Sequence, residues 1–417
     1  MIVLLHKISY VCRKISRTIM KYPIGIQDFE KIITGGYVYV DKTALVYRLV
    51  TEGNIYFLSR PRRFGKSLLV STLEAYFQGR KDLFKGLAID ELEKEWAKYP
   101  VFHLSFGGEN FLKHGALDTK LENIIGAWEA EYGTDPNYTT LGNRFQYVLK
   151  AAHQKFGRRA VVLIDEYDKP LLDVLDSGMK TSDGRNELLL EEHNRNVLKG
   201  FYSVFKSANA DLQFVLLTGV SQCWDDILCD YSANNLTLDS RYNSLCGYSA
   251  EELLNNFTEV ITELSSKYGY TFNETTEHLH QKYGGYYFSE STTEIYNPYS
   301  IMNVFSQLWL NDFWIGAFDP NYLIKRLIRN QEQIDNFVGK YYNSFEFCNF
   351  STIIPHTLPL LYQYGCLTIR GYDMKYDFWK LDIPNKEVEN GLKTLLEWYT
   401  PVFSSETGTI SEFMVRD

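Results

Sequence analysis

The feature that most constrains this chain is an apolar segment followed by an arginine-rich loop and a Gly-Lys-Ser triplet. Ile55 to Leu58 has the character of a buried strand, a tight loop follows, and a helix opens at Gly65-Lys66-Ser67. Backbone N–H groups at a helix N-terminus face an anion, while a lysine reaches the outer phosphates and a serine hydroxyl binds magnesium. The segment therefore predicts a site for a nucleoside triphosphate. We expect its phosphates to be bound at Arg62, Arg63, Phe64, Gly65, Lys66, Ser67 and Leu68.

The loop departs from the full phosphate-loop (Walker A) pattern at its first position, where Arg60 stands in place of glycine. Glycine is usual there because the position often needs a conformation that only glycine adopts cheaply. Together with Arg62 and Arg63, Arg60 gives the loop three guanidinium groups, whose planar forks suit phosphate oxygens. Two interpretations stay open: at least one of them contacts the polyphosphate, or they brace the loop against carboxylates.

A second apolar segment carries the acidic partner of such a loop. Ala160 to Ile164 suits a strand that is buried on both faces of a parallel sheet, and it ends in Asp165-Glu166. The carboxyl ends of strands are where open α/β sheets bind their ligands. Asp165 is therefore a candidate to hold Mg²⁺ with Ser67, and Glu166 a candidate general base. The alternative is that the two acids cap the turn before Pro170.

Two more segments fit the same sheet, Pro100 to Phe106 and Leu212 to Gly219. An extra strand, with a glutamate beside the aspartate, predicts the class of P-loop ATPases that insert a strand between the phosphate-loop strand and the acidic strand. In that class the strand after the acidic one ends in a polar residue that senses the γ-phosphate, and Thr218 stands at this point. The alternative for Thr218 is a hydroxyl bonded to its own backbone.

The segment ahead of the loop offers a further candidate contact. Asp41 and Thr43 precede a helical run from Ala44 to Val50. Either residue suits a helix N-cap, while in folds of this kind the segment just before the phosphate loop commonly flanks the base. Both interpretations stay open.

The chain resembles a known family, the AAA-ATPase-like proteins that often carry a PD-(D/E)XK nuclease-type domain at the C-terminus. The resemblance runs from Tyr22 to about Tyr399. It rests on Tyr22-Pro-Ile-Gly-Ile-Gln-Asp-Phe29, Tyr37-Val-Tyr-Val-Asp-Lys-Thr43, Ser59-Arg-Pro-Arg-Arg-Phe-Gly-Lys-Ser67, Leu163-Ile-Asp-Glu-Tyr-Asp168, Leu217-Thr-Gly-Val220, Tyr296-Asn-Pro-Tyr299 and Gly365-Cys-Leu-Thr-Ile369. The resemblance implies ATP binding and hydrolysis, and it makes Arg60 a family feature. The sequence ends at Asp417 without a later set of carboxylates and lysine, so nuclease activity is not carried over.

The pattern after the ATPase core, which we place at residues 20–240, predicts two further units. Residues 241–312 read as a helical lid, with helices over Ala250 to Tyr268, Thr276 to Tyr283 and Ser300 to Leu308. Residues 313–417 resemble a winged helix, with helices around Asn321 to Arg329 and His356 to Tyr364, then a hairpin that turns at Gly371 to Asp373 and a closing helix. Arg370, Lys375 and Lys380 give the hairpin little positive charge, because Asp373, Asp377 and Asp382 oppose it.

Composition limits the partners of the protein. With 43 basic and 52 acidic residues among 417, the net charge of −9 favours no global attraction to nucleic acid. Residues 1–19 form a basic leader, for which we expect Met20 to be the working start or the leader to be disordered or an accessory helix; a surface anchor is the alternative. The six cysteines form no C-x-x-C pair, which favours reduced thiols in the cytoplasm. No stretch is long enough for a membrane helix.

These patterns together predict a P-loop ATPase that uses ATP and Mg²⁺ as a switch or motor. The alternative is a nucleotide-binding regulatory or scaffold protein with little or no hydrolysis. We expect a protein partner or a homo-oligomer, and DNA is a weakly supported partner. Arg195 is a candidate arginine finger, against the alternative of a solvated helix face.

Overall fold

A five-stranded parallel sheet forms the centre of the computed structural model, which describes residues 20–182, 187–222, 233–317, 321–349 and 357–403. Its order is β7-β1-β6-β3-β2. The bounds are Ile55–Ser59 for β1, Val101–Ser105 for β2, Ala160–Asp165 for β3, Leu212–Gly219 for β6 and Asn234–Asn235 for β7. Every residue of β1 and β3 is buried, as their unbroken apolar sequence predicts.

Strand β6 lies between the phosphate-loop strand β1 and the acidic strand β3. Phe57 of β1 pairs with Leu217, and Leu163 of β3 pairs with Leu216. Strand β2, which precedes the acidic strand along the chain, lies at the outer edge beside β3. The fold class is therefore the expected α/β P-loop architecture with an inserted strand. The inserted strand is β6, which ends near Thr218.

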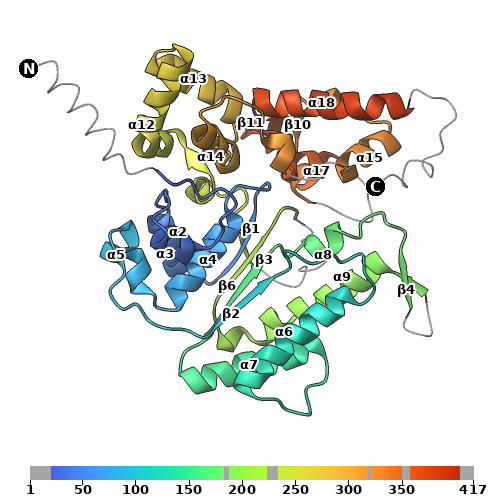
Figure 1. Cartoon of the computed structure of the whole chain (residues 1–417). Helices are drawn as coiled ribbons and strands as arrows, with labels where there is room; N and C mark the ends of the chain where they lie inside the picture. Colours follow the sequence, from blue (N-terminus) through green and yellow to red (C-terminus); the bar gives the residue numbers. More distant parts are fainter. Residues whose placement is uncertain (1–19, 183–186, 223–232, 318–320, 350–356, 404–417) are drawn as a thin grey trace, which may run out of the picture.

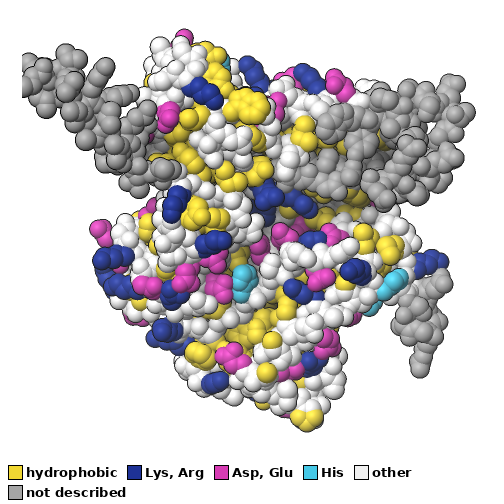
Figure 2. All heavy atoms as spheres, viewed as in Figure 1, with side chains coloured by type: hydrophobic (Ala, Val, Ile, Leu, Met, Phe, Trp, Pro, Cys, Tyr) yellow, Lys and Arg dark blue, Asp and Glu magenta, His cyan; other side chains and the backbone are white. Residues whose placement is uncertain are grey.

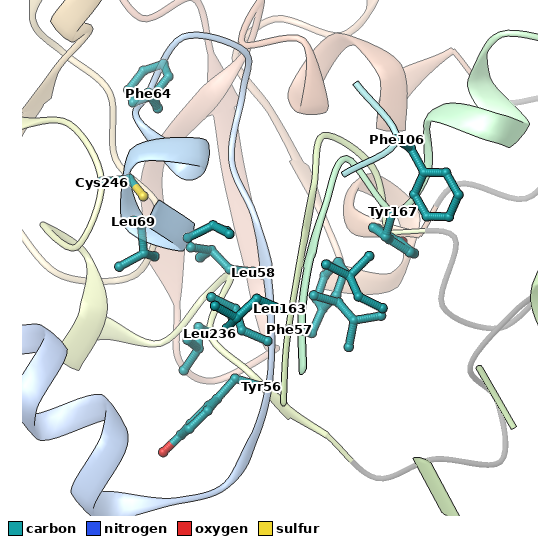
Figure 3. Packing of buried hydrophobic residues seen from close by; sticks show 14 of the residues in the cluster. Tyr56, Phe57, Leu58, Phe64, Leu69, Phe106, Leu163, Tyr167, Leu236 and Cys246 are labelled. Carbon is teal, nitrogen blue, oxygen red and sulfur yellow. The ribbon is translucent and has the colours of Figure 1, made fainter. Parts of the chain in front are cut away.

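Helices cover both faces of this sheet (Figure 1). One side carries α2 (Phe29–Thr34), α3 (Thr43–Glu52), α4 (Lys66–Phe77) and α5 (Ala88–Leu92). The other side carries α6 (Ala116–Tyr132), α7 (Leu141–Phe156) and α9 (Leu190–Tyr202). The core between these layers is apolar, and Figure 3 shows Phe57 and Leu163 packed beside Tyr167 within it.

Short elements join the layers. They are α8 (Lys169–Leu172), α10 (Val204–Ser207), η1 (Lys81–Phe84), η2 (Asn209–Asp211), η3 (Ser240–Tyr242), and two two-stranded sheets, of β4 (Lys180–Ser182) with β5 (Glu187–Leu189) and of β8 (Tyr248–Ser249) with β9 (Ile295–Tyr296).

Three capped helices form the lid above the sheet. They are α12 (Ala250–Tyr268), α13 (Phe272–Tyr283) and α14 (Pro298–Gln307). Ser249 and Thr271 each form a capping box with a glutamate three residues later, and Asn297 caps α14. These caps satisfy N–H groups that would otherwise lack a partner, so they fix where each helix begins. The predicted lid helices are present, with α13 and α14 beginning slightly earlier than expected.

The C-terminal module, residues 321–403, has the element order of a winged helix. The order is α15 (Asn321–Arg329), η5 (Ile334–Asn336), β10 (Lys340–Tyr342), α16 (Ser344–Cys348), α17 (Leu358–Gln363), β11 (Thr368–Asp373), β12 (Phe378–Asp382) and α18 (Lys386–Phe403), after η4 (Trp314–Ala317). Its three strands form an antiparallel sheet in the order β10-β12-β11. In Figure 1 the module lies beside the lid and above the core.

The predicted hairpin turn at Gly371 to Asp373 is wrong. Those residues continue β11, and the turn spans residues 374–377. A register shift between Ile369 and Gly371 marks a β-bulge, which inserts an extra residue and lets the strand continue through the glycine.

Two sequence predictions concern the N-terminal segment and the membrane. The basic leader, residues 1–19, lies outside the described residues. Among the helices that the structure describes, none combines the length and the apolar character needed to cross a membrane.

Candidate nucleotide-binding site

A cavity of about 300 Å³ opens at the carboxyl ends of the central strands. Seven of the predicted site residues line it: Arg62, Arg63, Gly65, Lys66, Ser67, Leu68 and Glu166. The N-terminal segment from Pro23 to Gln27, the core residues Asp168, Lys169, Leu172 and Val220, and the lid residues Tyr248, Pro298, Tyr299 and Met302 complete the lining. The cavity thus lies between core and lid, where the strand order predicts a ligand.

The loop before α4 has a backbone that ends in a left-handed turn. Arg63 has φ +69° and Gly65 has φ +99°. Helix α4 begins at Lys66, so the first N–H groups of this helix face the cavity. Lys66 is nearly buried, and its Nζ donates to the carbonyl oxygens of Arg60 at 2.8 Å and Pro61 at 3.0 Å. Burial lowers the pKa of Lys66, and nearby Asp165 opposes this change.

Asp165 and Thr218 form a buried pair behind the cavity lining. The Thr218 hydroxyl donates to Asp165 Oδ1 at 2.6 Å, and the backbone N–H of Glu166 donates to the same oxygen at 3.1 Å. Thr218 also contacts the carbonyl of Ile164 at 3.4 Å, so its main partner is the acidic residue and not its own backbone. Neither side chain is among those that line the cavity.

Glu166 and Asp168 present two different carboxylates to the cavity. Glu166 has φ +55°, a conformation that costs a non-glycine residue about 1–3 kcal/mol and is common at functional sites. Burial raises the pKa of Glu166, and the neighbouring Asp165 raises it further. Asp168 is buried and accepts from the N–H groups of Val220 and Ser221 and from the Ser221 hydroxyl, at 3.0, 2.6 and 2.6 Å.

Asp168 is a functional candidate to which sequence reasoning gave no role. It ties the segment after β6 to the turn after β3, so it fixes how Thr218 and Glu166 lie relative to each other. Gly219 is required beside it, because an added Cβ would lie 2.6 Å from Asp168 Oδ1. The signal in the sequence was a third acid two residues after Glu166.

Two loop residues differ from their expected positions. Phe64 is buried outside the larger cavity, where its ring contacts Tyr286 and Phe288 at centroid distances of 4.9 and 5.3 Å; Figure 3 shows it near Cys246, apart from the sheet core. Arg60 is also buried, and it contacts neither the cavity nor a carboxylate. Its guanidinium donates to the carbonyls of Ser59 and Thr237, both at 2.9 Å. Arg60 thus braces the loop against backbone carbonyls and not against carboxylates, whereas Arg62 and Arg63 line the cavity, so a phosphate contact by one of these two stays a prediction.

The candidates ahead of the loop and on α9 have structural roles in this conformation. Asp41 accepts from the N–H of Thr43 at 2.8 Å and from that of Ala88 at 2.7 Å. Thr43 in turn accepts from the N–H of Ile89 at 3.1 Å, so the two residues join α3 to α5. Arg195 pairs with Glu191, one turn away on α9, at 2.9 Å. The N-terminal segment that does reach the cavity is Pro23 to Gln27.

A second, smaller hollow of about 70 Å³ adjoins the start of α4. Its lining is mostly apolar and includes Val38, Val40, Leu68, Leu69 and Tyr248. At its edge, Lys42 of the core forms an ion pair with Glu252 of the lid at 2.5 Å. An ion pair therefore connects core and lid beside an apolar hollow of the kind that binds the aromatic base of a nucleotide.

The donor set fits a magnesium ion that is shared with phosphate. Asp165 Oδ1 is used by Thr218 and Glu166, whereas its Oδ2 accepts no hydrogen bond from the residues that the structure describes. Within the same residues, no cluster of three or more His, Cys, Asp or Glu could hold a metal by itself. Mg²⁺ is commonly held by one or two protein groups plus substrate phosphates, so a carboxylate and a hydroxyl such as those of Asp165 and Ser67 fit its requirements.

Comparisons with known proteins agree with this geometry. A family model described as "Predicted AAA-ATPase" matches residues 23–229. An "uncharacterized protein in vnfD 5'region" of Azotobacter chroococcum mcd 1 is 32% identical over 417 aligned residues, which cover 95% of this chain and 74% of that protein. This chain belongs to the AAA-ATPase-like family.

The same comparisons add a structural neighbour. The ORC1 protein of Aeropyrum pernix, solved in complex with DNA, aligns with 86% of this chain and 93% of its own, at 10% identity and a TM-score of 0.28. The fold assignment for this AAA-ATPase-like chain rests on its own strand order.

Proposed function

We propose that this AAA-ATPase-like protein binds ATP with Mg²⁺ and hydrolyses it, working as a switch or motor. The observation that carries the proposal is the convergence of Lys66 and Ser67, at the start of α4, with Glu166 on one cavity, directly in front of the Asp165–Thr218 pair. Three separate segments of the chain, at the start of α4 and the ends of β3 and β6, supply these groups. Packing of the core alone would not require these polar and charged side chains to lie at the same edge of the sheet.

Each residue has a defined task in this proposal. The N–H groups of the loop and the Lys66 ammonium bind phosphate oxygens. Ser67 and Asp165 hold the magnesium ion, which supplies charge neutralisation when it is bound. Thr218 keeps Asp165 oriented and senses the γ-phosphate through it. Glu166, whose pKa is raised by burial, accepts a proton from the attacking water.

The cytoplasmic location belongs to the same proposal. Cys246, Cys348 and Cys366 are buried free thiols, which suits a reducing compartment.

Thermal unfolding with and without ATP and Mg²⁺ tests the proposal. A ligand that binds only the folded state adds RT ln(1 + [L]/Kd) to its stability, so ATP with Mg²⁺ should raise the melting temperature. Lys66→Ala should abolish this rise, whereas Lys113→Ala, at an exposed position away from the cavity, should leave it intact. An unchanged rise in Lys66→Ala would place the nucleotide elsewhere.

One observation favours a second candidate, a regulatory protein that hydrolyses little by itself. The basic side chains that line the cavity, Arg62, Arg63, Lys66 and Lys169, all belong to the core, and the lid residues of the lining carry no charge. Arg63 lies with its guanidinium carbon 5.3 Å from the Tyr299 ring centre. An arginine that stabilises the transition state would then come from a second copy or a partner. Phosphate release that rises more than in proportion to protein concentration would support this candidate.

A further inference from the structure

The phosphate loop also contacts the C-terminal module, through its first two residues. The Arg60 guanidinium lies 4.3 Å from the ring centre of Phe288 of the lid, and it donates to the carbonyls of Thr237 and Tyr242 at 2.9 and 3.5 Å. Burial lowers the pKa of Arg60, and Tyr362 and Cys348 of the module lie close enough to oppose this change. Pro61 packs against Gly365, directly after α17, so closely that a Cβ added there would lie 3.1 Å from Pro61 Cβ. The start of the loop is therefore held from outside the nucleotide cavity.

The backbone of these same two residues holds the lysine that faces the cavity. Lys66 Nζ donates to the carbonyl oxygens of Arg60 and Pro61. A phosphate oxygen that binds Nζ competes with both carbonyls, and a hydrogen bond between two charged groups is the stronger one. Phosphate binding thus acts on the two residues that touch Phe288 and Gly365.

The module contacts the other two nucleotide segments as well. Arg326 of α15 is buried and pairs with Asp176, shortly after the acidic strand, at 2.7 Å. Asn349 forms a β-bridge with Gln222, shortly after β6. The C-terminal module therefore contacts the phosphate loop itself and the segments that follow the acidic strand and the Thr218 strand.

Helix α17 ends two residues before Gly365, which packs against Pro61 of the loop. All six of its residues, Leu358 to Gln363, are buried, and none is charged. The helix is short and depends on its packing, because isolated helices of this length are unstable in water. A small shift at Pro61 is therefore enough to change how firmly α17 is held.

We propose that the C-terminal module is a nucleotide sensor, with Arg60 as the positioning residue that transmits loop occupancy to it. Transfer of Lys66 from the two carbonyls to phosphate oxygens moves Arg60 and Pro61 and weakens the docking of α17. The proposal rests on the proposed function, since it requires nucleotide at the loop.

Hydrogen exchange of the full chain, with and without Mg²⁺ and a non-hydrolysable ATP analogue, tests the coupling. Binding is measured separately by thermal shift. Amides of residues 358–367 should exchange faster by about fivefold or more when the analogue is bound, because local opening there becomes easier. A thermal shift without any change in these amides overturns the proposal. Absence of a thermal shift means instead that the proposed function itself has failed.

Arg60→Lys then tests the role of the side chain. Lysine keeps the charge but loses the planar fork that reaches two carbonyls and stacks on Phe288. The analogue should still bind, within about threefold of the wild-type Kd, while the change in residues 358–367 disappears. Loss of binding as large as that of Lys66→Ala would make Arg60 a ligand contact and overturn its positioning role.

A pair of glycine variants tests the Pro61 contact without altering Arg60. Gly365→Ala and Gly339→Ala both strain a positive φ, +78° and +71°, but an added Cβ meets Pro61 only at Gly365 and nothing within 4 Å at Gly339. Gly365→Ala should change the Kd of the analogue by about threefold or more, whereas Gly339→Ala should lower stability alone. Equal Kd values for the two variants contradict coupling through Pro61.

Discussion

Asp165 is the residue on which the proposed magnesium site depends, and one side-chain hydroxyl and one backbone N–H orient it. Thr218 is fully buried and donates to Asp165 Oδ1 at 2.6 Å, which leaves Oδ2 for the metal. A threonine at the end of β6 therefore links the strand proposed to sense phosphate with the residue proposed to bind the ion. The sequence predicted both residues at this edge of the sheet. Their direct hydrogen bond could not be predicted, because it depends on β3 and β6 being neighbours in the sheet.

We expect Thr218→Val to separate metal binding from nucleotide binding. Valine keeps the shape of threonine but removes the donor, so a buried carboxylate loses its partner at a cost of about 1–3 kcal/mol. The Mg²⁺ concentration at half-maximal turnover should rise by about tenfold or more, while ATP affinity without metal changes little. A magnesium titration of phosphate release measures this.

Thr275→Val is the matched control for that experiment. Thr275 is as buried as Thr218, but its hydroxyl donates to the Thr271 carbonyl in α13 of the lid. The magnesium requirement should stay at the wild-type value. Equal magnesium curves for Thr218→Val and the wild type would show that Asp165 needs no orienting hydroxyl.

At the scale of elements, long apolar segments were predictable and short polar ones were not. Strands β1, β3 and β6 were found from their apolar runs, because burial on both faces leaves a clear pattern. Strand β7 escaped, since it consists of Asn234 and Asn235 and is exposed. The wing turn was misplaced because a bulge lets Gly371 remain within a strand.

Site residues from distant segments were harder to predict than those on the motifs. The Pro23 to Gln27 segment belonged to a recognised family motif, yet its place on the cavity follows from the fold alone. Arg60 suggested a phosphate contact because of its charge. Its burial against carbonyls and Phe288 arises from the docking of lid and module, which no local pattern contains.

From the burial and charge of the winged-helix module, we expect the protein to bind DNA only weakly. Helices α16 and α17 stand where a helix-turn-helix would lie, and the second of the pair is the one that would enter the major groove. Helix α17 is buried and uncharged, so in this packing it is not accessible to DNA. On the face shown in Figure 2, basic and acidic side chains are interspersed, without a broad surface of one sign. We expect the full chain to bind duplex DNA with a Kd of about 10⁻⁵ M or weaker at physiological salt.

Fluorescence anisotropy with labelled duplex DNA measures this affinity. Lys375→Glu combined with Lys380→Glu should change it little, because acids already interleave with these lysines in the hairpin. Nanomolar binding with a steep salt dependence that the double variant abolishes would make the wing a DNA reader.

At the scale of the whole molecule, Glu387 joins the lid to the C-terminal module. It is buried at the start of α18 and accepts from the N–H groups of Phe313 and Trp314 and from the Ser300 hydroxyl, at 2.6, 3.1 and 2.8 Å. Burial raises the pKa of Glu387 to about 7. The folded protein therefore binds a proton here that the unfolded chain has already lost at neutral pH.

Stability should accordingly fall as the pH rises through about 7. A carboxyl group whose pKa is raised on folding contributes fully below its unfolded pKa and loses that contribution above its folded pKa, on the order of 3 kcal/mol here. Glu387→Gln should remove much of the difference between pH 5 and pH 8 in urea unfolding. An unchanged pH dependence in this variant would mean that Glu387 is ionised in the folded protein throughout this range.

Core and lid meet around one cavity, and the central claim is that this cavity hydrolyses ATP. Glu166→Gln tests the claim most directly, because it keeps the size of the side chain and the Asp165 metal ligand but removes the base. We predict that ATP and Mg²⁺ still raise the melting temperature of the variant as in the wild type, while phosphate release falls by about 10²-fold or more. Wild-type phosphate release at the level of Glu166→Gln, with ATP bound in both, would contradict hydrolysis and leave a nucleotide-binding scaffold.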